Sequence, residues 1–134
     1  MTLPTGELVL AGGYTGSQYL DSVETYDVDG WDAGFQPIPT TVYQHCMVLI
    51  DNEAVLLIGG IQGSEYSAKT HMFYPALNVW VEGPSLNVAR SRHSCGVVKR
   101  DVESGDLSVV VTGGYNGEYL SSVEVFILII YYNS

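Results

Sequence analysis

Three histidines and a few carboxylates are the side chains of this sequence that are best suited to chemistry. The histidines, His45, His71 and His93, lack the tight spacing of a metal site. Asp21 and Glu24 lie three residues apart on an expected strand or its entrance, so they face different ways and suit acid–base catalysis poorly. The sequence contains no phosphate-binding glycine loop and no nucleophile elbow. The residue types therefore favour binding over catalysis, and we expect no catalytic residue, no metal and no cofactor.

The two cysteines follow histidines at different distances. Cys46 comes directly after His45, whereas Cys95 lies two residues after His93. In paired strands that offset directs the two side chains to opposite faces. We therefore expect two reduced, partly buried thiols, which favours an intracellular compartment.

Composition narrows the classes of partner. The 134 residues are 46% hydrophobic, as in globular proteins, and carry a net charge of −10 that disfavours nucleic acids and anionic membranes. The first residues lack the features of a signal peptide, and no apolar run approaches the roughly 20 residues of a membrane-spanning helix. We expect a cytoplasmic protein with no nucleic-acid partner and no membrane partner.

The segments that position these side chains belong to a sequence repeat. Residues 12–26 read GGYTGSQYLDSVETY, and residues 113–126 read GGYNGEYLSSVEVF. A more divergent third copy, GGIQGSEYSAKTHMFY, occupies residues 59–74 between them. The unit is therefore about 50 residues long, a period typical of kelch repeats.

Each copy has the pattern of short antiparallel strands. Apolar, β-branched runs such as residues 54–58 enter each glycine doublet, and an alternating run such as residues 22–26 follows the next loop. The glycines allow backbone conformations closed to other residues and the close approach of a neighbouring strand. No stretch shows a helical period, so the sequence predicts an all-β, antiparallel fold. The expected strands are 6–13, 20–27, 31–36, 42–50, 53–60, 69–74, 79–82, 94–99, 107–114 and 119–126.

These spacings make the sequence resemble the kelch repeat family, whose four-stranded blades close into a β-propeller. The signature residues that match are the glycine doublets, the aromatic that ends the third strand and the tryptophan five or six residues later. They are Gly12, Gly13, Tyr26, Trp31, Gly59, Gly60, Tyr74, Trp80, Gly113, Gly114 and Phe126. The basic and histidine residues that open an innermost strand match Arg90, Arg92 and His93, with His45 in the middle unit. The resemblance implies that the aromatics and tryptophans fill the space between neighbouring blades.

The resemblance divides the chain into a partial kelch-type β-propeller. A partial blade at 1–40 precedes a complete four-stranded blade at 41–86, a partial blade at 87–126 and an atypical C-terminal tail at 127–134. So few blades cannot close into a ring, so some edge strands and some faces of the sheets stay exposed to solvent. The chain is either a fragment of a longer propeller, a truncated product or a piece completed by other subunits, of which we favour the first two. We expect the isolated chain to aggregate or to melt without cooperativity.

The resemblance also implies a binding surface. Residues after the glycine doublets lie beside the start of an innermost strand, on one rim of the propeller, where kelch domains capture peptide segments. The candidate partner-binding residues are Tyr14, Thr15, Tyr43, Gln44, Ile61, Gln62, Arg92, Tyr115 and Asn116. Arg92 beside Tyr115 could pair with a partner carboxylate, although both could equally brace neighbouring loops.

We therefore expect a non-catalytic protein-interaction module with a protein partner. In the family such modules serve as substrate receptors of cullin ubiquitin ligases, as actin-binding proteins or as scaffolds. The alternative is a fragment of an enzymatic or metal-binding propeller of the galactose-oxidase type.

Overall fold

The structure, a computed structural model, describes residues 1–99, 103 and 105–128. Within these residues the fold is all-β and antiparallel with no helix, as the sequence predicts. That part of the chain accordingly offers no long apolar helix with which to cross a membrane. The strands are β1 (Leu8–Tyr14), β2 (Tyr19–Asp27), β3 (Gly30–Asp32), β4 (Val42–Tyr43), β5 (Cys46–Ile50), β6 (Ala54–Ile58), β7 (Ile61–Gln62), β8 (Glu65–Tyr66), β9 (Thr70–Tyr74), β10 (Val79–Glu82), β11 (Ser94–Lys99), β12 (Leu107–Thr112) and β13 (Val123–Leu128).

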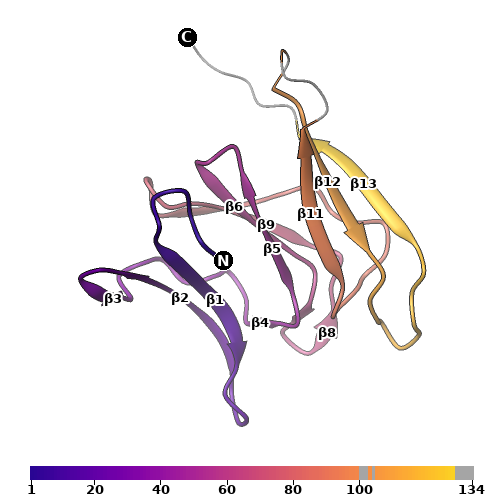
Figure 1. The fold of residues 1–134 in the computed structure, drawn as a ribbon. Helices are drawn as coiled ribbons and strands as arrows, with labels where there is room; N and C mark the ends of the chain where they lie inside the picture. The colour runs from indigo at the N-terminus through magenta and orange to yellow at the C-terminus, as the bar shows by residue number, and fades with distance from the viewer. Residues whose placement is uncertain (100–102, 104, 129–134) are drawn as a thin grey trace.

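Three sheets follow one another along the chain and fan out side by side (Figure 1). The first sheet has the order β1-β2-β3, the second β10-β9-β6-β5 and the third β11-β12-β13, while β4-β7-β8 form a small fourth sheet. A four-stranded sheet thus lies between two three-stranded sheets, as the repeat predicts. β13 continues to Leu128, so the first two residues of the expected C-terminal tail pair with β12. The rest of that tail, residues 129–134, lies outside the described residues.

The glycine doublets mark the same corner of each sheet. All six glycines have positive φ, between 61° at Gly59 and 116° at Gly13. A Cβ on Gly60 would lie 2.7 Å from the carbonyl oxygen of Tyr43, and one on Gly114 would lie 2.6 Å from that of Ser91. Only glycine tolerates both the conformation and this approach of a neighbouring backbone.

The strand register corrects one signature residue. The residue four positions before each doublet pairs with the aromatic of the third strand: Leu8 with Tyr26, Val55 with Phe73 and Val109 with Phe126. The second unit therefore places Phe73, not the expected Tyr74, in the position of Tyr26. Phe73 is also the more buried of the two, at 1% exposed.

The core consists of the two layers between neighbouring sheets. One layer, between the first and second sheets, is formed by Val9, Ala11, Val23, Ile38, Val42, Val55, Leu57 and Phe73. The other, between the second and third sheets, is formed by Val48, Ile50, Ala54, Leu56, Ile58, Leu86, Leu107, Val109 and Val111. The connections between sheets repeat as well. The N–H of Ile38 donates to the carbonyl of Asp21 and the N–H of Leu86 donates to the carbonyl of Ala68, each at 2.7 Å, and Asp21 and Ala68 occupy equivalent positions in their units.

The two tryptophans occupy equivalent positions in different surroundings. Trp80 stacks on Phe73 at 4.8 Å between ring centroids and donates its indole N–H to the carbonyl of Gln36, so it packs between sheets as expected. Trp31 is 59% exposed and touches Tyr26 on the outer face of the first sheet. The expected packing of Tyr26 and Trp31 between two sheets is therefore wrong for this chain, because no described element covers that face.

The expectation of two reduced thiols is also wrong. Cys46 on β5 and Cys95 on β11 form a disulfide, with their Cα atoms 6.1 Å apart. The two strands are not paired with each other but are edge strands of neighbouring sheets that contact each other. The face of β5 that carries Cys46 is turned toward the face of β11 that carries Cys95. The different spacing of each cysteine from its histidine therefore brings the two sulfurs together. Because the cysteines are paired, they give no reason to favour an intracellular compartment.

Candidate functional site

The residues after the glycine doublets form short hairpins on one side of the molecule. Tyr14 pairs with Tyr19 at the end of the β1–β2 hairpin, and Tyr115 bridges to Tyr119 in the third unit. In the second unit, Ile61 on β7 pairs with both β4 and β8. Figure 1 shows these hairpins along its lower edge, beneath all three sheets.

The hairpins gather a row of aromatic rings. Tyr19 stacks on Tyr43 at 4.7 Å and on Tyr14 at 5.0 Å between ring centroids. Farther along, Tyr115 lies 5.9 Å from Tyr66 and 5.2 Å from Tyr119. The small sheet joins the two groups, because Ile61 lies between Tyr43 and Tyr66. We call this surface the tyrosine rim and define it as Tyr14, Tyr19, Tyr43, Tyr66, Tyr115 and Tyr119.

The tyrosine rim is open to solvent and slightly hollowed. Tyr14 and Tyr119 are 53% and 93% exposed. A shallow hollow of about 260 Å³ lies between Tyr19, Tyr43 and Tyr66, with Ile61 on its wall. Exposed tyrosines supply large apolar contact area at low entropic cost, and each hydroxyl can still form a hydrogen bond.

Some of the predicted site residues belong to this surface and others are used within the fold. Tyr14, Tyr43, Ile61 and Tyr115 all lie on it. The amide of Gln62 instead donates to the carbonyls of Gly59 and Lys69 and contacts His71, so it braces its own hairpin. The hydroxyl of Thr15 accepts from the N–H groups of Ser17 and Gln18 and so caps its own loop. Gln44 contributes its main-chain carbonyl to the N–H of Arg92, and Asn116 donates its N–H to Glu118.

Arg90 and Arg92, which match the same family motif, differ in burial and in ion pairing. Arg92 is exposed and, in the part of the chain that the structure describes, joins no salt bridge. It follows Ser91, whose main chain exchanges two hydrogen bonds with Tyr115, so Arg92 stands next to the tyrosine rim. Arg90 is fully buried and pairs with Glu124. Burial alone would raise the pKa of Glu124, but hydrogen bonds from Asn87, Arg90 and Val88 outweigh it and hold the pKa below its ordinary value.

Half of the tyrosine rim was not predicted as a site. Tyr19, Tyr66 and Tyr119 stand at the same point of the three copies, at the end of the loop after each doublet. That recurrence is visible in the sequence. Its meaning depends on the hairpins, which return each of these rings to the residues directly after the doublet.

The histidines that precede β5 and β11 are structural. Nε2 of His93 lies 2.9 Å from the carbonyl oxygen of Ile58, directly before the second doublet, and His45 lies close to Gly12 and Gly60 of the first two doublets. Burial lowers the pKa of His45 to about 4, although the backbone of Ala11 acts in the opposite direction, and burial lowers the pKa of His93 as well. Among the described residues, no three His, Cys, Asp or Glu side chains are grouped as metal ligands would be.

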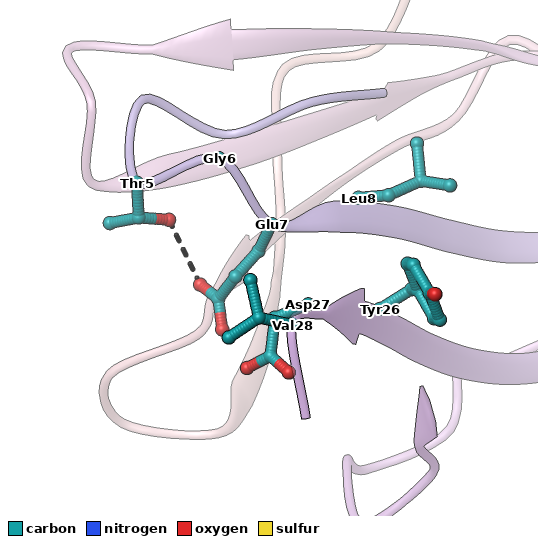
Figure 2. A pocket seen from close by; sticks show the side chains of 7 residues that line it. All are labelled: Thr5, Gly6, Glu7, Leu8, Tyr26, Asp27 and Val28. Atoms are coloured by element: carbon teal, nitrogen blue, oxygen red, sulfur yellow. Dashed lines mark hydrogen bonds between the residues drawn. The ribbon is translucent and has the colours of Figure 1, made fainter. Parts of the chain in front are cut away.

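Another hollow lies beside the N-terminal loop, at the opposite end of the β1–β2 pair from Tyr14 and Tyr19 (Figure 2). It measures about 740 Å³ and is lined by residues 5–8 and 26–28. Its carboxylates are engaged locally, because Glu7 accepts from the hydroxyl of Thr5 and Asp27 accepts from the N–H of Asp29. The lining offers no nucleophile paired with a base, so we assign it no chemistry.

Comparison with known proteins adds no family. Neither the scan against protein-family models nor the search of curated proteins finds a match to the chain. Function is therefore inferred from the repeat and from the geometry of the tyrosine rim.

Proposed function

We propose that the three sheets are blades of a kelch-type β-propeller and that the chain is a non-catalytic module whose tyrosine rim binds an extended segment of a protein partner. The gathering of six tyrosines from three successive units onto one edge carries this proposal. Aromatic side chains and arginine are the residues enriched at the energetic centres of protein interfaces.

The surroundings of the tyrosine rim suggest what the bound segment contains. The rings and the hollow beside Ile61 would hold apolar or proline side chains, as aromatic grooves do in other peptide-binding domains. The exposed guanidinium of Arg92 would pair with one carboxylate of the partner. The net charge of −10 further favours a protein partner over a nucleic acid or an anionic membrane.

Selection of peptides tests the proposal. A displayed library of random peptides is panned on the immobilised chain and counter-selected on the variant Tyr19→Ala/Tyr66→Ala/Tyr119→Ala, which removes one exposed ring from each unit. We expect enriched peptides whose affinity falls at least about 30-fold in the variant, the size expected for loss of an interface hot spot.

The control is Leu77→Ala, which removes an exposed apolar side chain outside the tyrosine rim. It should leave the affinity unchanged. Melting temperatures of both variants should stay close to that of the parent, because the substituted side chains are exposed. Peptides that bind the rim variant and the parent equally well would refute the proposal.

A further inference from the structure

The two outer sheets each leave one apolar face uncovered by described residues. On the first sheet, Leu10 and Tyr26 are 44% and 46% exposed, beside Trp31. We call the surface of Leu8, Leu10, Tyr26 and Trp31 the N-face; Figure 2 shows Leu8 and Tyr26 at the ends of their paired strands. On the third sheet, Val123 and Val125 are 57% and 60% exposed. We call the surface of Val98, Val123, Val125 and Ile127 the C-face.

The repeat shows what covers an N-face. By register, Leu8, Leu10 and Tyr26 of the first sheet correspond to Val55, Leu57 and Phe73 of the second. Those three residues are at most 1% exposed, because they pack against the first sheet. The corresponding residues of the third sheet, Val109, Val111 and Phe126, pack against the second sheet in the same way.

The repeat also shows what covers a C-face. Val123 and Val125 correspond by register to Val23 and Thr25 of the first sheet, which are buried on the side of the second sheet. Their counterparts in the second sheet, Thr70 and Met72, lie on the side of the third sheet, where Met72 packs into the core. In each of the two core layers, a surface equivalent to the N-face therefore packs against a surface equivalent to the C-face.

We infer that two copies of the chain associate head to tail, with the N-face of each copy packed on the C-face of the other. One copy carries both complementary surfaces, so a pair related by a twofold axis covers all four faces. Such contacts between unlike surfaces close into a ring when the rotation allows it. Two copies would set six sheets around one axis, which is within the four to eight blades of known propellers. The tyrosine rim plays no part in this contact, so failure of the inference would leave the proposed function standing.

Sedimentation velocity of the chain over a range of concentrations tests the association. The uncovered faces of a single copy predict aggregation, but their mutual burial in a closed pair predicts a discrete species of twice the 14.6 kDa chain mass that dissociates on dilution. A chain that stays monomeric, or that grows into open-ended polymers, would overturn the inference.

Two charge substitutions then test its head-to-tail geometry. Leu10→Lys alters the N-face and Val125→Lys alters the C-face, and each variant alone should be monomeric because both contacts of its dimer are damaged. An equimolar mixture keeps one intact N-face and one intact C-face, so it should regain a one-to-one dimer. The recovered dimer also shows that both variants fold. Leu77→Lys, at a position 71% exposed outside both faces, should remain dimeric. A mixture that stays monomeric would overturn the inference.

Discussion

Arg90 and Glu124 form a buried ion pair that ties the entrance of the third sheet to its last strand. Nη2 of Arg90 lies 2.8 Å from Oε2 of Glu124, and the arginine side chain is fully buried. The same guanidinium donates to the carbonyls of Gly113 and Ser122, while the carboxylate accepts from the N–H of Asn87 at 2.6 Å. One pair of side chains thus holds together the third glycine doublet, the start of β13 and the segment before β11.

Breaking this pair should cost more stability than any change on the nearby surface. Arg90→Ala leaves the Glu124 carboxylate without its guanidinium, and we expect a loss of about 3–5 kcal/mol in the free energy of unfolding. Arg92→Ala, two residues away and exposed, should change it by less than about 0.5 kcal/mol. Urea denaturation of both variants measures the difference, and equal midpoints would contradict the structural role of Arg90.

The disulfide should stabilise the chain by restricting its unfolded state. Cys46 and Cys95 are 49 residues apart, and the chain-entropy model gives about 4 kcal/mol for a loop of that length. Reduction should therefore lower the melting temperature of the oxidised protein markedly. The variant Cys46→Ser/Cys95→Ser should melt near the reduced protein and should not respond to reductant. Quantitative alkylation of both thiols in protein purified without reductant would show that the bond does not form.

Stability should fall as the pH is lowered from neutral. His45 has a pKa of about 4 when folded, against about 6.5 in the unfolded chain, so between these values the unfolded chain binds a proton that the folded chain does not. The free energy of unfolding should therefore drop by about 2 kcal/mol from this group between pH 7.5 and pH 5.0. The pKa values of the buried His71 and of the partly buried His93 are also lowered, so both residues act in the same direction.

The variant His45→Gln isolates that contribution. Denaturation at both pH values should show a smaller drop in the variant than in the parent, since glutamine takes up no proton. An identical drop in the two proteins would mean that His45 titrates normally in the folded chain.

Substitution of two glycines in one loop measures separately the effects of close packing and of backbone conformation on stability. Gly60 and Gly63 both have positive φ, but a Cβ on Gly60 would meet the Tyr43 carbonyl oxygen at 2.7 Å, whereas one on Gly63 meets open space. Gly63→Ala should cost about 1 kcal/mol from conformation alone, and Gly60→Ala should cost at least about 2 kcal/mol more. Thermal denaturation of the pair compares them directly, and similar losses would argue against the close approach.

Local signals in the sequence were enough to predict the strands. The glycine doublets, the apolar runs before them and the turns gave β10 and β11 their observed bounds, and most other strands within a few residues. The sequence predicts a loop where the short strands β7 and β8 lie, because two-residue pairings leave no periodic pattern.

Relations between units were harder to predict. Residue type matches Tyr74 to Tyr26, whereas the pairing of Val55 selects Phe73. The offset of the cysteines predicts separate thiols only if β5 and β11 pair in one sheet, whereas the two strands lie in adjacent sheets. The position of Gln62 after a doublet predicts a binding residue, yet its amide donates to carbonyls of its own hairpin. In each case the outcome depends on contacts that spacing along the chain does not specify.

The most direct test of the account is to observe which tyrosines a bound peptide contacts. The chain is labelled with ¹³C-tyrosine and titrated with a peptide from the selection, while the aromatic resonances are followed by NMR. We expect the resonances of Tyr26 and Tyr74 to stay in place and those of the tyrosine rim to shift, namely Tyr14, Tyr19, Tyr43, Tyr66, Tyr115 and Tyr119. Shifts confined to Tyr26 and Tyr74, with the six tyrosines of the rim unchanged, would contradict the proposed function.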